Sequence, residues 1–212
     1  MALICKKWEF ISSESQLVEI APDGCRDIIF SISKDNGESF HIYEIANSTD
    51  EITIDADVFL LGFRLNPAAI IDYNSMRKLF LGDKIKIDNM ADNINEIARI
   101  DENINEALHF LGQGNLKIET CAKNLGVSVR TMQREVLRKT GKTPIFWQQL
   151  ARARKSAKSL YLSPDLTETA YDYGYSDQSH LNREMKRWFN KTPLQIAQDN
   201  DFYKMLCAPA YF

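Results

Sequence analysis

The chain has 212 residues, enough for one large domain or two small ones, with 44% hydrophobic residues, 26% charged residues and a formal net charge of −3. No stretch approaches the roughly eighteen consecutive apolar residues that a membrane helix needs, and the amino terminus does not read as a signal peptide. These features exclude a membrane-spanning protein, and we expect a cytoplasmic protein without membrane contact.

The cysteines and histidines form no pattern typical of a metal site or of catalysis. Cys5, Cys25, Cys121 and Cys207 lie too far apart in the sequence to suggest a zinc pair, and they read as isolated reduced thiols. The sequence has no P-loop, no glycine-rich dinucleotide turn, no nucleophile elbow and no paired-carboxylate motif. We therefore expect no enzyme activity, no cofactor and no metal.

The net charge conceals a division between the two halves of the chain. Residues 1–114 contain 10 Lys and Arg against 20 Asp and Glu, a net of −10, whereas residues 115–198 contain 15 against 7, a net of +8. This asymmetry indicates two domains, the basic one facing a polyanion. The opposite charges also make an autoinhibitory contact between the halves conceivable, and high salt would weaken such a contact.

The acidic half opens with segments typical of a small antiparallel sheet or barrel. Five or more short strands are predicted, because the segments are rich in Ile, Val and Phe and partly alternate. Asp35-Asn36-Gly37 is typical of a hairpin turn between two of them. The five segments cover residues 16–22, 25–33, 39–45, 51–57 and 57–65.

Two helices are predicted after these strands, over residues 67–80 and 92–111. The apolar residues of the second helix fit either a dimer seam or a helix that lies on the sheet. They recur in steps of 3, 4, 4 and 3, at Ile97, Ile100, Ile104, Leu108 and Leu111. A linker is expected over residues 112–116, where two glycines stand.

Two side chains are candidates for an effector site. Arg64 stands in an otherwise apolar strand and needs a partner, either a nearby carboxylate or an anionic ligand. Cys25 is either a thiol that lines an effector pocket or senses oxidants, or a buried residue at a strand end. Two alternatives stay open for this domain: an enzyme with Cys25 as nucleophile, which would need an activating base, and a ligand-free module that controls a partner protein.

The basic half contains the same pattern of residues twice. Residues 120–144 read TCAKNLGVSVRTMQREVLRKTGKTP, and residues 169–193 read TAYDYGYSDQSHLNREMKRWFNKTP. Each copy begins with an apolar stripe of helical spacing and then has a glycine where a helix ends. The stripes and glycines are Ile118, Cys121, Ala122, Leu125 and Gly126 in the first copy, and Leu166, Thr169, Ala170, Tyr173 and Gly174 in the second.

A second helix follows in each copy, over residues 129–140 and 178–189, so that each copy is a helix-turn-helix. Each of these helices has an N-cap before it and a residue that tolerates a left-handed C-cap after it. The caps are Ser128 and Gly141 in the first copy, and Asp177 and Asn190 in the second. Lys-Thr-Pro follows both times, with Thr as the N-cap and Pro at the first position of the next helix.

The outer faces of the two second helices carry polar residues that can bond to base edges, since Arg pairs with guanine and Gln or Asn with adenine. The base-reading candidates are Arg130, Gln133, Arg134, Gln178, Ser179, Asn182 and Arg183. Other residues of the same units are expected to anchor phosphates. The phosphate candidates are Thr131, Lys139, Lys142, His180, Lys186, Arg187 and Lys191.

A single long helix is predicted between the two copies. Residues 144–164 read PIFWQQLARARKSAKSLYLSP, whose apolar period indicates a helix of about eighteen residues, roughly 27 Å long. Such a rod can hold two recognition helices near one DNA turn apart, about 34 Å, in successive major grooves. Its outer side is interpreted as solvated or phosphate-facing, with Arg152, Arg154, Lys155 and Lys158.

Residues 118–198 resemble the DNA-binding domain of the AraC/XylS family of bacterial transcription regulators, and GYSDQSHLNREMKRWFNKTP is the most diagnostic segment. APDGCRDIIF and LLGFRLNPAAI resemble the barrel-like amino-terminal domain of one subgroup. The sequence departs from the family where Ala153-Arg154 replaces a frequent Arg-Leu, which puts a linker-helix contact in doubt. Leu181 and Met185 also replace common phenylalanines, and Asn190 replaces a usual glycine.

The resemblance implies an α+β protein of two domains. A β-rich sensor or dimerisation domain covers residues 1–111, a double helix-turn-helix domain covers 117–198, and a tail covers 199–212. We expect a transcription regulator that reads an asymmetric site on double-stranded DNA, and we expect a homodimer, a small-molecule effector and RNA polymerase as further partners. The aromatic residues Trp8 and Phe10 and those of the tail either pack across domains or belong to disordered ends.

Overall fold

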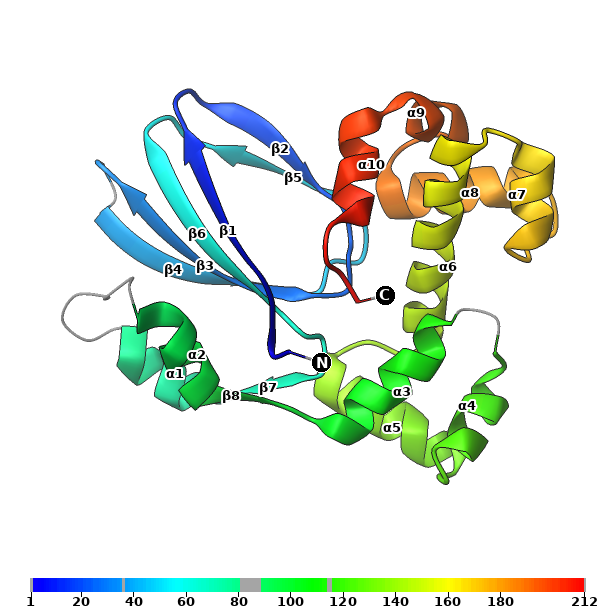
Figure 1. Cartoon of the computed structure of the whole chain (residues 1–212), viewed down its shortest axis with the longest axis horizontal. Helices are drawn as coiled ribbons and strands as arrows, with labels where there is room; N and C mark the ends of the chain where they lie inside the picture. Colours follow the sequence, from blue (N-terminus) through cyan, green and yellow to red (C-terminus); the bar gives the residue numbers. More distant parts are fainter. Residues whose placement is uncertain (1, 36, 81–88, 114–115, 212) are drawn as a thin grey trace.

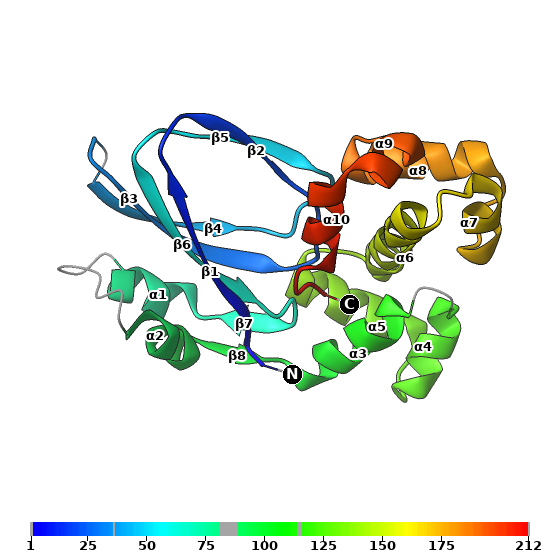
Figure 2. The ribbon, with the colours of Figure 1, turned by 45° about the horizontal axis from the view of Figure 1, so that its top comes forward.

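The computed structural model describes residues 2–35, 37–80, 89–113 and 116–211. A β-rich part comes first along the chain, and helices make up the part after residue 101 (Figure 1). The predicted α+β class is confirmed. Turned by 45°, the same ribbon shows β2 and β5 facing the larger sheet across the interior of an open barrel (Figure 2).

The barrel consists of a four-stranded and a two-stranded antiparallel sheet. The order of the larger sheet is β1-β6-β3-β4, and β2 pairs with β5. All five predicted strand segments are present, as β2, β3, β4, β5 and β6. The bounds are β1 (Ile4–Ser12), β2 (Gln16–Ile20), β3 (Arg26–Ser33), β4 (Gly37–Tyr43), β5 (Asp50–Ile54) and β6 (Val58–Leu65).

Strand β1 has a sequence signal that the prediction did not use. The half-buried Trp8 and Phe10 alternate with the exposed Lys7, Glu9 and Ile11, which is the period of a strand with one covered face. The predicted hairpin also exists, because β3 and β4 pair antiparallel. Asn36, the middle residue of its predicted turn, lies outside the described residues.

The two helices predicted after the sheet have different bounds in the structure. The first, α1 (Tyr73–Phe80), starts later than predicted, because β7 (Ala69–Ile71) occupies part of the predicted range. The predicted helix over 92–111 is wrong, since the segment is divided by a short strand that pairs with β7. The elements of that segment are α2 (Met90–Ile97), β8 (Ala98–Ile100) and α3 (Glu102–Gly112).

The apolar residues of α2 and α3 are buried inside the chain. Met90, Ile94 and Ile97 pack against the larger sheet, whereas Leu108 and Leu111 of α3 share a core with the helices that follow. The interpretation of this stripe as a dimer seam is therefore wrong. In the predicted linker, Gly114 and Asn115 lie outside the described residues.

The helical part is built around the long helix α6 (Pro144–Leu162), with one helix-turn-helix unit at each end (Figure 1). Its apolar stripe is covered on all sides, and Trp147, Leu150, Ala153, Ala157 and Leu160 are 0% exposed. The other helices are α4 (Ile118–Asn124), α5 (Val129–Thr140), α7 (Leu166–Asp172), α8 (Gln178–Phe189), α9 (Pro193–Gln198) and α10 (Asn200–Cys207).

Candidate nucleic-acid interface

The turn of each helix-turn-helix unit has the backbone that its sequence predicts. Gly126 and Gly174 have φ of +67° and +69°, which side chains with a Cβ rarely adopt. Ser128 accepts a hydrogen bond from the N–H of Thr131 at 3.1 Å, and Asp177 accepts one from His180 at 2.7 Å. Because free helix N–H groups need acceptors, these caps fix where α5 and α8 begin.

The carboxyl ends and inner faces of α5 and α8 also match the prediction. Gly141 and Asn190 are left-handed C-caps with φ of +73° and +54°. The side chains between each helix and α6 are apolar and at most 3% exposed, and this burial fixes which face points outward. The buried side chains are Met132 and Val136 on α5, and Leu181, Met185, Trp188 and Phe189 on α8.

The outward faces of α5 and α8 carry the seven base-reading candidates. Six are exposed, and Asn182 is half-buried. Arg134 lies 3.4 Å from the carboxylate of Glu135, and Gln178 donates a hydrogen bond to Thr167 at 2.6 Å. Exposed ion pairs of this kind are weak, so Arg134 is available to a stronger partner.

The seven phosphate candidates differ in the partners that they have. Lys186 and Arg187 are exposed near the end of α8, where Lys186 donates to the carbonyl of Asn190 at 3.1 Å and Arg187 pairs with Glu184 at 3.2 Å. Three lysines contact the amino-terminal part of the chain instead, each through a carboxylate or an amide oxygen. The pairs are Lys139 with Asp101 at 3.1 Å, Lys142 with Asn47 at 2.7 Å, and Lys191 with Glu19 at 2.8 Å. Thr131 and His180 are the residues whose backbone N–H groups bind the N-caps.

The Lys139–Asp101 pair predicts a pH dependence of stability. Burial opposes ionisation of Asp101, but hydrogen bonds from Lys139 and from the N–H of Ile104 outweigh burial and lower its pKa below the ordinary 3.8. A lowered pKa in the folded state stabilises the fold above the unfolded-state value, and this stabilisation is lost as the pH falls through the folded-state pKa. Asp101→Asn, which keeps the cap, should lower the melting temperature at pH 7.

Melting curves of the wild type and Asp101→Asn between pH 7 and pH 3 measure this effect. The difference between the two proteins should shrink below the ordinary carboxyl pKa of 3.8. Glu119→Gln, an exposed carboxyl on α4, is the matched control and should change little. A difference that stays constant down to pH 3 would contradict a role of the ionised Asp101.

The interpretation of α6 as carrying a solvated basic face is wrong for Arg154. This side chain is 1% exposed and donates to the carbonyl of Pro22 at 3.0 Å and to that of Leu206 at 2.8 Å. Desolvation lowers its pKa. Arg152 lies 4.6 Å from the ring centre of Tyr175. The departure from the family at residue 154 therefore accompanies a contact between α6, the tail and the barrel.

The amino-terminal part also binds the carboxyl ends of α5 and α8, a feature that sequence reasoning missed. Arg26, which is 8% exposed, donates to the carbonyl of Thr140 at the end of α5 at 3.3 Å. The backbone N–H of Thr49 donates to the carbonyl of Trp188 near the end of α8 at 2.8 Å. No local pattern signals these contacts, because their acceptors are backbone carbonyls, which every residue possesses.

Arg64 has carboxylate partners, so the first of its two predicted kinds of partner is present. Its guanidinium lies 2.9 Å from Asp23 and 3.1 Å from Asp27. Burial opposes the charge, but these carboxylates hold the pKa of Arg64 above its ordinary value. Burial also raises the pKa of Asp27, against the hydrogen bond from Arg64.

Arg64 lines a cavity of about 510 Å³ between the two sheets. The wall is mostly apolar, with side chains from β1, β2, β3, β5 and β6. Arg64, Asp23 and Asp27 form its polar end, and Met205 and Ala208 of the carboxy-terminal segment also contribute to the lining. An apolar cavity with a few converging polar groups is the usual form of a small-molecule site.

Cys25 is 4% exposed and lies outside the lining of this cavity. Burial raises the pKa of its thiol well above the ordinary value, followed by the effect of Asp23. A nucleophilic cysteine needs the opposite shift, because the thiolate is the reactive form. The geometry therefore favours the buried strand-end residue over the enzyme and effector-lining interpretations of Cys25.

The described residues contain neither a cluster of metal ligands nor a membrane-spanning helix. No group of three or more His, Cys, Asp or Glu among them is placed to hold a metal ion. Likewise, none of the helices in the described ranges is long and apolar enough to cross a membrane.

Residues 121–199 match the family described as a helix-turn-helix domain. Over 94 residues the chain is 32% identical to the HTH-type transcriptional activator RhaS of Escherichia coli O1:K1 / APEC, and equally to RhaS of strain UTI89 / UPEC. These alignments cover 44% of this chain, and the chain spans 33% of the length of each relative. Both relatives are thus named as transcriptional activators of the helix-turn-helix type.

Two solved structures are also similar. The carboxy-terminal domain of AraT, a response regulator from Geobacillus stearothermophilus, gives a TM-score of 0.42 at 22% identity, over 47% of this chain and 87% of that one. ToxT from Vibrio cholerae gives 0.43 at 10% identity, over 94% and 97%. Scores of this size carry no argument about function. The sequence match and the two helix-turn-helix units of the chain therefore place residues 121–199 in the matched helix-turn-helix family.

Proposed function

We propose that the chain is a sequence-specific transcription regulator that binds double-stranded DNA with two recognition helices, α5 and α8. The observation that carries this proposal is the pair of capped helices, each with an exposed polar face, at opposite ends of α6. Helix α6 has 19 residues, about 28 Å at 1.5 Å per residue, close to the one-turn spacing of successive major grooves.

The two outer faces carry different residues, so the two DNA segments differ in sequence. Arg130, Gln133 and Arg134 read one segment, and Gln178, Ser179, Asn182 and Arg183 read the other. The site is therefore asymmetric and not a palindrome. Lys186 and Arg187 are exposed and bind phosphates, with Thr131, Lys139, Lys142, His180 and Lys191 as further candidates.

A hydroxyl-radical footprint on a tightly bound duplex tests this arrangement. Two protected segments should appear on one face, with centres about 10 base pairs apart. Arg134→Ala should weaken protection in one segment, and Arg183→Ala in the other. One protected segment, or equal loss in both segments with either variant, would overturn the paired readout.

The barrel cavity supports a second part of the proposal, an effector site. Its apolar wall and the polar end formed by Arg64, Asp23 and Asp27 suit a small, mainly apolar molecule with one polar group. The charged side chains that line the cavity balance one another, so the site has no excess positive charge for an anion. The cationic ones are Lys6, Arg64, Arg154 and Lys204, and the anionic ones are Glu9, Glu19, Asp23 and Asp27. The ligand-free module that controls a partner protein remains the alternative.

A fluorescent probe distinguishes these two possibilities. The uncharged apolar dye N-phenyl-1-naphthylamine should bind the wild type saturably, with enhanced emission. Ile52→Trp fills the cavity and should abolish the enhancement, whereas Ile11→Trp, at a position that is 75% exposed, should leave it intact. Equal binding to both variants would mean that the dye sits elsewhere and would leave the effector site without support.

Three further expectations belong to this proposal. A regulator of bacterial promoters acts in the cytoplasm, and it contacts RNA polymerase if it activates transcription. The expected homodimer would use a surface other than the stripes of α2 and α3, which the chain itself covers.

A further inference from the structure

The end of the chain, residues 208–211, lies between the barrel and α6. The backbone N–H of Tyr211 donates to the carbonyl of Asp23 at 3.0 Å, and its hydroxyl donates to the carbonyl of Leu108 on α3. The Tyr211 ring lies 4.6 Å from that of Trp147 on α6, and the residue is 8% exposed. Tyr211 thus contacts the barrel at Asp23 through its backbone, and α3 and α6 through its side chain.

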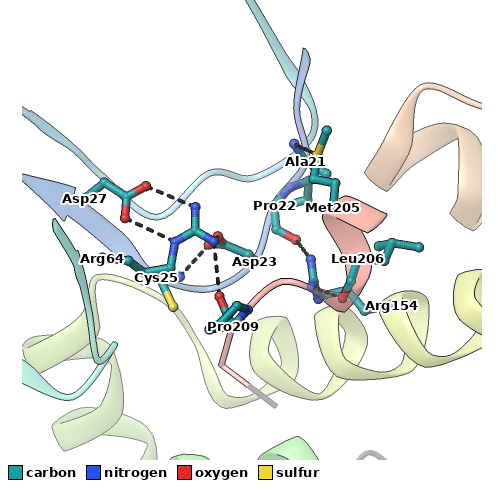
Figure 3. Close-up of polar contacts among 10 residues, drawn as sticks. All are labelled: Ala21, Pro22, Asp23, Cys25, Asp27, Arg64, Arg154, Met205, Leu206 and Pro209. Carbon is teal, nitrogen blue, oxygen red and sulfur yellow. Dashed lines mark hydrogen bonds and ion pairs between the residues drawn. The ribbon is translucent and has the colours of Figure 1, made fainter. Parts of the chain in front are cut away.

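Arg64 holds the same segment from the barrel side. Its guanidinium donates to the carbonyl of Pro209 at 3.1 Å while it pairs with Asp23 and Asp27 (Figure 3). Because both carboxylates fix the guanidinium, the Nη1 group that donates to Pro209 has a set direction. The segment is therefore anchored at the polar end of the barrel cavity.

Arg154 joins the same three parts a few residues away. It connects the carbonyl of Pro22 in the barrel loop with that of Leu206 in α10, as Figure 3 shows. The loop is packed without space to spare, since a Cβ at Gly24 would lie 2.8 Å from Tyr211 and 2.9 Å from Trp147. A side chain at this position would force the tail and α6 away from the barrel.

The contacts of Tyr211, Arg64 and Arg154 set the position of the barrel relative to α5 and α8. In this position the barrel contacts two lysines of the helical part, Lys191 through Glu19 and Lys142 through Asn47. It also binds the last turns of α5 and α8 through Arg26 and Thr49. The barrel-side segments also supply the acidic half of the charge division. The barrel residues that pair with these lysines, and the negative charge around them, compete with a DNA phosphate backbone for the same lysines.

We propose that residues 208–211 form a strap that locks the barrel onto both helix-turn-helix units in a state with reduced DNA affinity. Opening the strap frees the lysines and moves the acidic half away from the DNA. This inference rests on the proposed DNA binding, but the lock itself can be measured without DNA.

Two variants open the strap from opposite sides. Tyr211→Ala removes the anchor, and Gly24→Ala inserts a methyl group against it while the sequence of the helical part is unchanged. Gly37→Ala is the matched control: its φ of +68° gives similar backbone strain, but no atom lies within 4 Å of the added Cβ. Opening should raise the affinity for a duplex selected with the intact chain by about tenfold, a typical coupling between two sites.

Amide hydrogen exchange reports the lock independently, because the N–H of Thr49 in the barrel donates a hydrogen bond to the carbonyl of Trp188 in α8. Both opening variants should speed exchange at Thr49 and leave the interior of α6 protected, and Gly37→Ala should do neither. Unchanged exchange at Thr49 would overturn the strap. Faster exchange with unchanged or weaker DNA binding would overturn its inhibitory role. If none of the proteins binds DNA, the proposed function fails, while exchange still decides the lock.

Discussion

Alanine at both Arg134 and Arg183 should lower the affinity for the specific duplex by about 2 to 6 kcal/mol, because each arginine that bonds two acceptors of a guanine contributes about 1 to 3 kcal/mol. The two side chains are exposed and lie on different recognition helices, α5 and α8. Their effects should therefore add, as for independent sites. Each single variant should relax sequence preference in its own segment only.

The control for charge alone is Arg138→Ala. Arg138 lies on the same helix as Arg134, is 57% exposed and pairs with Glu135, but it is not among the base-reading candidates. It should weaken specific and random duplexes equally and only slightly. Anisotropy titrations at one fixed salt concentration compare Arg138→Ala with the two single variants and the double variant. An equal loss on specific and random DNA for Arg134→Ala would contradict base reading by that residue.

Replacing Arg154 by alanine should lower the free energy of unfolding by about 2 to 4 kcal/mol, since it leaves two buried carbonyls without their donor and creates a cavity. The guanidinium donates to Pro22 and Leu206, and the side chain is almost completely enclosed. The loss should appear as a lower urea midpoint, measured with probes in both the barrel and the helices.

Arg152→Ala is the matched control for this second prediction. Arg152 stands two residues earlier on α6 and is half-buried, with its guanidinium over the ring of Tyr175. Removing such a partly exposed contact should cost only about 0.5 to 1 kcal/mol. Similar losses in the two variants would mean that the bonds from Arg154 to the barrel and tail contribute nothing specific.

The helix-turn-helix units could be predicted from the sequence because their determinants are local. Ser128 caps a helix that begins at the next residue, and Gly141 ends it with a left-handed residue twelve positions later. Asp177 and Asn190 do the same in the second copy. Each signal acts within one helix, so reading the chain in order recovers both recognition helices and the faces they expose.

The segment between the sheet and these units could not be predicted in the same way. Ala69–Ile71 and Ala98–Ile100 are three-residue strands that pair with each other across the 26 intervening positions 72–97, and neither is long enough to show a period. The apolar steps of 3 and 4 continue through β8, because Ile97 at the end of α2 is buried and Ile100 at the end of β8 is half-buried. The apolar pattern alone therefore does not distinguish this strand from a continued helix. Tertiary pairing therefore decided against one long helix.

The outward-facing residues of the candidate site could be predicted from the sequence, but the contacts between the helical part and the barrel could not. The exposed polar residues of α5 and α8 follow from helical periodicity alone. The partners of Arg154, Arg26 and Tyr211 are backbone carbonyls on distant segments, and no residue type marks such an acceptor. Arg154 was predicted to be solvated because it is a basic residue on a helix, but it is buried. Burial depends on which distant segments pack against that turn of the helix, and the local sequence does not show this.

Selection of the tightest binders from random duplexes, repeated at two salt concentrations, tests the central claim most directly. The account predicts enrichment of one two-part, non-palindromic motif that spans about two turns of DNA, retained at the higher salt with lower overall affinity. Salt-sensitive binding without any enriched motif would show that α5 and α8 grip phosphates only, and it would contradict paired sequence readout.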